Sequence, residues 1–121
     1  MRLNKQKFGL FRNTSFALMG LKEIFTNESS FRTEVYIFIV CQVVFFLLPI
    51  SMQAKAILST STFLPLFAEL ANSAVERCVD LVTMEHNEKA KAAKDAGSAM
   101  VFASFIITGL IWFWTAFFLI F

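Results

Sequence analysis

The chain has 121 residues and a formal net charge of +2, and 57% of its residues are hydrophobic while only 17% are charged. Soluble domains carry about 25% charged residues, and so short and apolar a chain has too little polar surface to cover itself in water. The small net charge, without a Lys and Arg run interleaved with aromatic residues, argues against a nucleic-acid partner. With a mean hydropathy of +0.64, the composition predicts one integral membrane domain, residues 1–121.

The N-terminal region, residues 1–32, predicts a helix that lies on the membrane surface. Its basic residues are Arg2, Lys5, Lys7, Arg12, Lys22 and Arg32. Its apolar residues recur at helical spacing, and they are Phe8, Phe11, Leu18, Leu21 and Phe25. This periodicity indicates an amphipathic helix, and basic side chains beside an aromatic stripe suit the membrane interface. The alternative is a soluble helix packed on a protein core, but the following segments leave little soluble core to pack against.

Three apolar segments follow, and they predict an all-α membrane protein with three transmembrane helices. The first covers about residues 35–50 and the second about 55–82, where Pro65 is a point at which the helix can kink. The third covers about 98–121 and ends near two Trp residues, which are enriched at membrane interfaces. Between the last two lies a charged connector, residues 83–97, rich in helix-favouring Ala and Lys.

The distribution of basic residues predicts the orientation of the chain in the membrane. Three crossings place the N-terminus and the second connector on the same side. That side carries the basic N-terminal region with Lys89, Lys91 and Lys94, whereas the first connector has only Lys55. The positive-inside rule therefore places the N-terminus in the cytoplasm and the C-terminus outside.

A polar stripe interrupts the second apolar segment. It consists of Glu69, Asn72, Ser73 and Glu76, with Asp80 one turn further. The spacing i, i+3, i+4, i+7 aligns these side chains on one helix face, and ionisable groups at membrane depth are expensive and usually functional. Two such carboxylates can divide tasks, because one can accept a proton while the other helps to hold a divalent cation. The alternative is that the stripe only bonds neighbouring helices together, which does not require repeated acids on one face.

Further charged residues flank the apolar segments. Lys94 precedes the third segment, where a lysine can contact phosphate as a compact cation, and Asp95 can hold Lys94 or serve a metal. Taken alone, the two residues also fit a solvated pair of connector charges, and Glu28 fits a solvated charge at the end of the surface helix. The chain has no GxxxxGK[ST] loop and no GxGxxG, HRD or DFG motif, which argues against P-loop enzymes and protein kinases.

Two blocks of this sequence resemble the signature of bacterial diacylglycerol kinases, a family of small membrane lipid kinases that includes undecaprenol kinases. The first block is ELANSAVE, residues 69–76, followed by Asp80, and the second is AKDAGSA, residues 93–99. Upstream, NESSFR at residues 27–32 and Glu34 resemble the surface-helix motif of the family. The resemblance extends over about residues 12–110 and is densest over 69–99.

The resemblance implies a homotrimer in the bacterial inner membrane that transfers the γ-phosphoryl group of ATP to diacylglycerol, with Mg²⁺ as cofactor. It implies that Glu69 is the catalytic base and that Glu28 and Glu76 bind the metal and the nucleotide. The residues that match nucleotide-contacting positions are Lys94 and Asp95. The residues that match further active-site positions are Asn72, Glu34 and Ser98.

The sequence departs from the family in two places. Gly9 stands where relatives often carry an arginine, which leaves Lys7 or Arg12 as substitutes, and Glu85-His86-Asn87 stands where relatives often show a Tyr-His pair. Contacts to the nucleotide base therefore do not transfer to this chain.

Two other functions are open at this point. A kinase of the same architecture could phosphorylate undecaprenol, although the Gly97-Ser98-Ala99 version of the motif and the surface helix favour diacylglycerol. The alternative of another class is a small oligomeric transporter or channel subunit, in which the acidic residues of a short span bind cations or protons.

Overall fold

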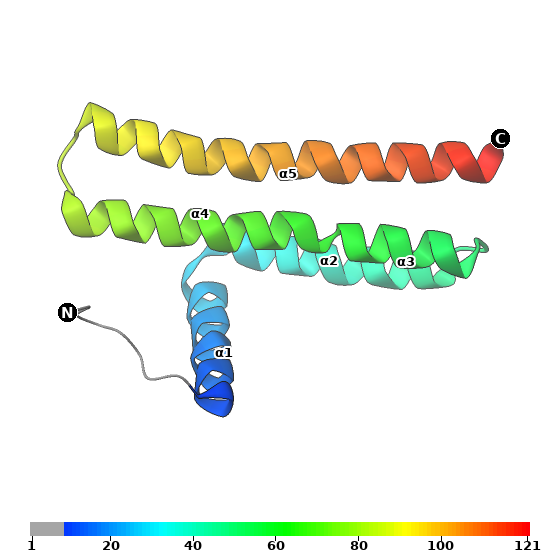
Figure 1. Ribbon diagram of the computed structural model, residues 1–121, viewed down its shortest axis with the longest axis horizontal. Helices are drawn as coiled ribbons and strands as arrows, with labels where there is room; N and C mark the ends of the chain where they lie inside the picture. The colour runs from blue at the N-terminus through cyan, green and yellow to red at the C-terminus, as the bar shows by residue number, and fades with distance from the viewer. Residues whose placement is uncertain (1–8) are drawn as a thin grey trace.

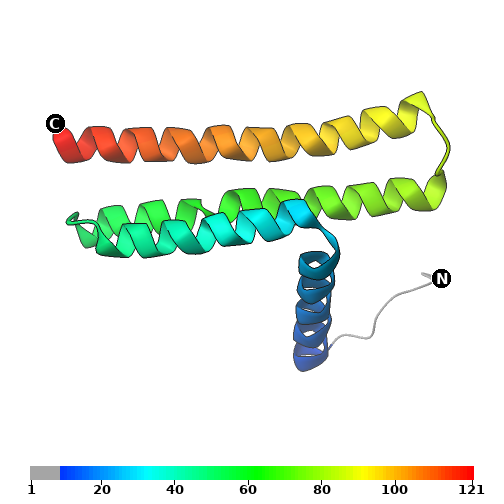
Figure 2. The same cartoon turned by 180° about the vertical axis from the view of Figure 1, so that it is seen from behind.

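The computed structural model describes residues 9–121, and every regular element in this range is an α-helix. Helix α1 (Leu10–Asn27) runs across an elongated bundle made by α2 (Ser29–Leu47), α3 (Met52–Ser61), α4 (Phe63–Val82) and α5 (Glu88–Ile120) (Figure 1). Helices α3 and α4 follow one another along one line, and α5 returns antiparallel beside both (Figures 1 and 2). The most extensive packing is between α4 and α5. The predicted basic positions Arg2, Lys5 and Lys7, with Phe8, lie outside the described residues.

Helix α1 makes up the described part of the predicted surface helix, and it ends beside Glu28, where the sequence places the end of that helix. None of its residues is buried, and apolar Phe11 and Leu18 are 91% and 62% exposed. After Asn27 the chain leaves the helix at Glu28, and residues 29–32 already belong to α2. An uncovered apolar stripe on a separate helix is what a membrane surface would cover.

Helix α2 begins six residues before the predicted first span and ends before Pro49. Leu48, which precedes Pro49, has extended backbone angles of φ −64° and ψ 139°, because a following proline disfavours the helical region. The earlier start places Glu34 within α2 rather than at its end.

The predicted second span is two helices separated by Thr62. Pro65 has no N–H to donate to the Ser61 carbonyl four residues earlier, so the helical hydrogen bonding is interrupted there. The Thr62 N–H and hydroxyl both donate to the Ser59 carbonyl, at 3.3 and 2.6 Å. The Thr108 hydroxyl of α5 lies 2.9 Å from the Ser104 carbonyl of its own helix and 3.4 Å from the Ser61 carbonyl. The kink expected at Pro65 is therefore a one-residue break located three residues before it.

Helix α5 starts inside the predicted charged connector. The Asn87 Oδ1 accepts hydrogen bonds from the N–H groups of Lys89 and Ala90, at 2.9 and 3.1 Å, and such a cap satisfies the free donors at a helix start. The predicted third span, 98–121, is the later part of this helix of 33 residues. At 1.5 Å per residue it is about 50 Å long, which exceeds the ~30 Å hydrocarbon core of a bilayer.

Within residues 9–121, two helices, α2 and α5, are long and apolar enough to cross a membrane. Helix α4 is not apolar enough, because it carries Glu69, Glu76, Arg77 and Asp80. The structure therefore supports two crossings by length and composition, where the sequence pattern predicts three.

The distribution of polar residues is the reverse of that in a soluble protein. Buried residues include Glu69, Asn72 and Ser73, whereas most of the large apolar side chains of α2 and α5 are exposed. An apolar outer surface of this kind is compatible with lipid rather than water. Small and polar side chains are typical of the contacts between membrane helices.

Candidate active site

The predicted polar stripe lies on the inward face of α4. The buried residues of α4 are Pro65, Ala68, Glu69, Asn72 and Ser73, and their spacing of three or four residues defines one face of a helix. Glu69 is 7% exposed and Asn72 is 8% exposed. The structure thus confirms that the stripe occupies one face. Its residues Glu69, Asn72 and Ser73 point into the bundle, whereas the side chain of Asp80 is 42% exposed.

Glu28 is brought to this face by the turn between α1 and α2. Its backbone is extended, with φ −111° and ψ 114°, so it belongs to neither helix. Its carboxylate accepts a short hydrogen bond from the Ser73 hydroxyl and a hydrogen bond from Arg77 Nη2 at 2.8 Å. With its side chain only 24% exposed, Glu28 is anchored to α4 and is not the solvated helix-end charge that local sequence allows.

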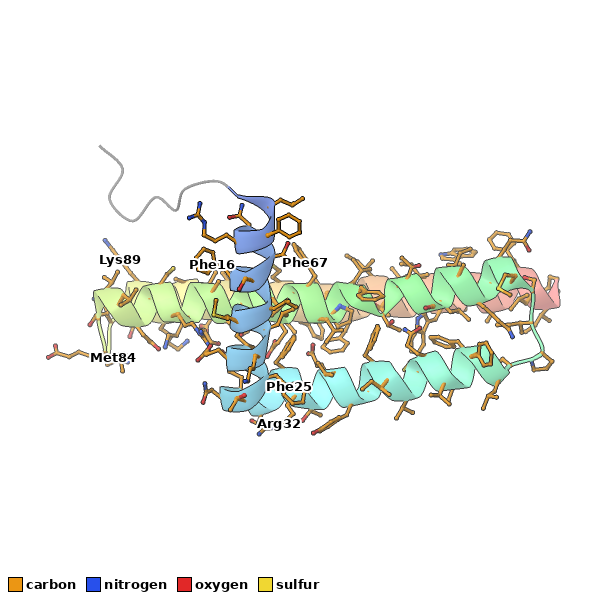
Figure 3. The ribbon with its side chains drawn as sticks, turned by 90° about the horizontal axis from the view of Figure 1, so that it is seen from below. Phe16, Phe25, Arg32, Phe67, Met84 and Lys89 are labelled. Atoms are coloured by element: carbon orange, nitrogen blue, oxygen red, sulfur yellow. The ribbon has the colours of Figure 1, made fainter. Side chains whose placement is uncertain are left out.

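The turn that places Glu28 is stabilised by Arg32. Its Nη1 atom donates to the carbonyls of Phe25 and Thr26, at 3.1 and 3.0 Å, which are among the carbonyls left free at the end of α1. Figure 3 shows Phe25 and Arg32 together where α1 gives way to α2. Arg32, one of the basic residues of the predicted surface helix, therefore belongs to α2 and caps α1.

Arg77 also binds a residue that sequence reasoning missed. Its Nη1 atom lies 2.6 Å from Glu23 Oε2, so one guanidinium joins carboxylates from the end of α1 and from the α1–α2 turn. The hydrogen bond from Arg77 lowers the pKa of the Glu23 carboxyl, and one from Asn27 adds to this effect. An arginine within an otherwise apolar helix is a signal that an acidic partner is near, although the sequence does not say which acid it is.

Asn72 and Glu76 form the next part of the face. The Asn72 Nδ2 donates to Glu76 Oε1 at 3.1 Å, and the Asn72 Oδ1 is buried without a hydrogen-bond partner among the described residues. Gly97 of α5 lies against this oxygen, because a Cβ there would be 2.2 Å from it. The AKDAGSA block of residues 93–99 and the ELANSAVE block of residues 69–76 are therefore in direct contact through Gly97 and Asn72.

Glu34 of α2 and Glu69 of α4 are acids on two helices that pack against each other. The Glu34 Oε2 atom is buried without a partner among the described residues, and no described residue forms a hydrogen bond or ion pair with the Glu69 carboxylate. Two unpaired acids in one interior are unfavourable for folding alone. They have acceptor capacity available for a proton or a ligand.

The basic residues at the start of α5 are paired differently from the sequence expectation. Lys94 Nζ lies 2.6 Å from Asp80 Oδ1 of α4, whereas Asp95 is bound by Lys91 at 2.7 Å, one turn earlier on α5. Asp95 therefore does not hold Lys94. Neither Asp95 nor the exposed Ser98 is joined by a hydrogen bond or ion pair to the carboxylates on α4 among the described residues.

The oxygen ligands at this face suit Mg²⁺ better than a metal whose coordination is completed by protein side chains alone. Residues 9–121 hold no group of three or more His, Cys, Asp or Glu side chains arranged for a metal. Mg²⁺ usually takes only one or two carboxylates and completes its coordination with phosphate oxygens and water. Glu28 and Glu76 would supply the two carboxylates of such a site.

The fold and the site together define a small helical integral membrane protein, in which a buried acidic face lies beside Arg77 and Lys94. Comparison with known proteins identifies its family. The sequence profile of prokaryotic diacylglycerol kinases matches residues 15–116, and the chain belongs to this family.

Individual relatives agree with this assignment. A Haemophilus influenzae protein named diacylglycerol kinase is 39% identical over 104 residues, which cover 85% of this chain and 87% of that protein. A Pseudomonas aeruginosa protein of the same name is 36% identical over 99 residues, covering 82% and 80%. An Escherichia coli K12 protein of that name is 29% identical over 103 residues, covering 85% and 84%. The chain is accordingly a lipid kinase.

Proposed function

We propose that the protein transfers the γ-phosphoryl group of ATP to the hydroxyl of diacylglycerol, giving phosphatidic acid and ADP. The relatives from H. influenzae and P. aeruginosa carry the name of this activity and align over at least 80% of both chains. The observation that carries the proposal is the position of Glu69, buried on α4 with no partner for its carboxylate among the described residues. A carboxylate in that state is available to take a proton from a lipid alcohol.

Glu69 acts as the general base in this proposal. The lipid hydroxyl oxygen forms a bond to the γ-phosphorus while the bond from that phosphorus to the β–γ bridging oxygen breaks. ADP leaves, and the hydroxyl proton passes to Glu69. A positioned base of this kind contributes about 10²- to 10⁴-fold in rate.

The remaining site residues neutralise and orient the phosphates. Phosphoryl transfer depends mainly on positioning and on compensation of charge, which Mg²⁺ supplies when it is held by Glu28 and Glu76. Lys94 binds a phosphate, and Asp80, at 2.6 Å from its Nζ, directs it toward the acidic face. Asn72 keeps Glu76 in place through their hydrogen bond, and Asp95 and Ser98 contact the nucleotide.

The proposed arrangement has three crossings of a bacterial inner membrane, by α2, by α3 with α4, and by α5, with the N-terminus in the cytoplasm. The charged half of α4 and the start of α5 then face the cytoplasm, where ATP is available. We further propose a homotrimer. An open groove of about 550 Å³ between α3 and α5, whose lining includes the apolar residues Ile57, Leu110 and Trp114, is a surface that a neighbouring protomer would cover in such an assembly.

The test is a phosphorylation assay of the purified protein in mixed micelles, with diacylglycerol or undecaprenol as acceptor and with or without Mg²⁺. We expect Mg²⁺-dependent formation of phosphatidic acid, and a much lower rate with undecaprenol. Faster turnover of undecaprenol would overturn the proposal that diacylglycerol is the substrate. The transporter alternative requires that wild type and Glu69→Gln both lack phosphorylation and differ in proton flux across vesicles.

A further inference from the structure

Arg77 holds two carboxylates at once, and the proposed reaction uses only one of them. Its Nη1 atom lies 2.6 Å from Glu23 Oε2, and its Nη2 atom lies 2.8 Å from Glu28 Oε1. Glu23 is near the end of α1, whereas Glu28 is in the turn that follows. One arginine on α4 therefore binds an acid from each of these two places.

Both oxygens of the Glu28 carboxylate are hydrogen-bonded in this state. Ser73 donates to one of its oxygens and Arg77 donates to the other. An arginine guanidinium keeps its positive charge at every accessible pH, so a divalent cation that approaches Glu28 is repelled by it. The cation and Arg77 therefore oppose each other at one carboxylate.

Glu23 gives Arg77 another place to bind. The side chains of Arg77 and Glu23 are 46% and 47% exposed, so neither is confined by packing. If Arg77 releases Glu28, it keeps its hydrogen bond to Glu23 and no charge is left unpaired.

We infer that Arg77 competes with Mg²⁺ for Glu28, and that Glu23 draws Arg77 away when the cation binds. This ion-pair relay would set the Mg²⁺ concentration that the kinase needs. Arg77 is in this sense a positioning residue, and the inference rests on the proposed role of Glu28 in binding the metal.

The first test is the Mg²⁺ concentration for half-maximal phosphorylation in two neutral variants. In Arg77→Gln it should fall, since the competitor is gone. In Glu23→Gln it should rise, since Arg77 then has only Glu28. Because exposed ion pairs are weak, each shift in the half-maximal Mg²⁺ concentration should be up to about fivefold. If the pair only tethers α1 to α4, both variants shift in the same direction.

The second test separates competition from the general effect of removing a charge. In the Arg77→Gln background, the further change Glu23→Gln should leave the Mg²⁺ requirement unchanged, because Glu23 acts only through Arg77. Additive shifts in this double-mutant cycle would overturn the inference. Glu88→Gln removes an exposed carboxylate from the pair with His86 and is the matched charge control, expected to cause no shift.

A binding measurement that does not depend on turnover completes the design. Protein-bound Mn²⁺ is measured by electron paramagnetic resonance with a non-hydrolysable ATP analogue, against the analogue alone. We expect the same order of affinity, with Arg77→Gln tightest and Glu23→Gln weakest, and with Arg77→Lys restored toward wild type. Unchanged Mn²⁺ affinity in all variants would refute the relay alone, whereas Mg²⁺-independent wild-type phosphorylation would refute the proposed function.

Discussion

Gly97 of α5 lies so close to Asn72 of α4 that a Cβ at position 97 would be 2.2 Å from the Asn72 Oδ1 atom. The Asn72 side chain on the other side donates to Glu76 at 3.1 Å. The absence of a side chain at Gly97 thus determines where Asn72 and Glu76 sit. This contact links the two sequence blocks that resemble the family.

Gly97→Ala should lower the rate of phosphorylation while changing the free energy of unfolding little. The added methyl group pushes the end of the Asn72 side chain away, which breaks its bond to Glu76 but leaves the backbone able to adapt. We expect a loss of about tenfold in rate, or ~1.4 kcal/mol of activation free energy. Gly109→Ala on the same helix is the control, because nothing lies within 4 Å of its added Cβ; equal losses in both variants would argue against the role of the contact.

Glu69→Gln should lower kcat by about 10²- to 10⁴-fold, the usual contribution of a general base. The KM for ATP should change little, because Glu69 is proposed to act on the lipid hydroxyl. Steady-state kinetics in mixed micelles measure both values. Glu85→Gln in the exposed connector is the matched control, and wild-type kcat in Glu69→Gln would exclude the proposed base.

Glu76→Gln should raise the Mg²⁺ requirement by about tenfold or more, on the scale seen when residues that support metal ligands are changed. The amide retains the shape of the side chain and a hydrogen-bond acceptor for Asn72, but it loses the negative charge. A Mg²⁺ titration of activity measures the effect. An unaltered titration curve would remove Glu76 from the metal site.

Thr108→Val should destabilise the bundle without a large local rearrangement. Its hydroxyl bonds to the Ser104 carbonyl of its own helix at 2.9 Å and also contacts, at 3.4 Å, the Ser61 carbonyl that Pro65 leaves free. Hydrogen bonds between membrane helices contribute about 0.6 kcal/mol on average and up to about 1.7 kcal/mol. Unfolding in mixed detergent measures the loss. Thr115→Val is the control, because the Thr115 hydroxyl bonds to Ile111 of its own helix; an equal loss there would mean that the contact across the break contributes nothing.

Lowering the pH should break the ion pair between Glu23 of α1 and Arg77 of α4, and so release α1. The pKa of Glu23 is lowered from its usual 4.5, chiefly by the hydrogen bond from Arg77. Because the pKa of Glu23 is lower in the folded protein than in the unfolded chain, the ion pair stabilises the fold at pH values above the unfolded-state pKa. This stabilisation is lost as the pH falls through the folded-state pKa. Limited proteolysis of α1 should therefore accelerate below about pH 4.5, and Arg77→Gln should be cleaved quickly at neutral pH as well. Cleavage in wild type that does not change with pH would contradict this.

The helices and the polar stripe could be predicted from the sequence because both follow from local spacing. Residues 69, 72, 73 and 76 share a face in any α-helix, and a proline interrupts helical bonding wherever it stands inside one. The apolar composition likewise predicts that lipid surrounds the chain. The resemblance of residues 69–76 and 93–99 to a family was also present in the sequence, and the family comparison confirms it.

The partners of Arg77 and Lys94 on other helices were decided by the tertiary structure alone. Lys94 binds Asp80 rather than its neighbour Asp95, and Arg77 of α4 reaches Glu23 of α1. Hydrogen bonds act over about 3 Å, whereas spacing along one helix says nothing about which residue of another helix comes that close. Helix faces are a local property of the sequence, but contacts between helices exist only once the helices have packed.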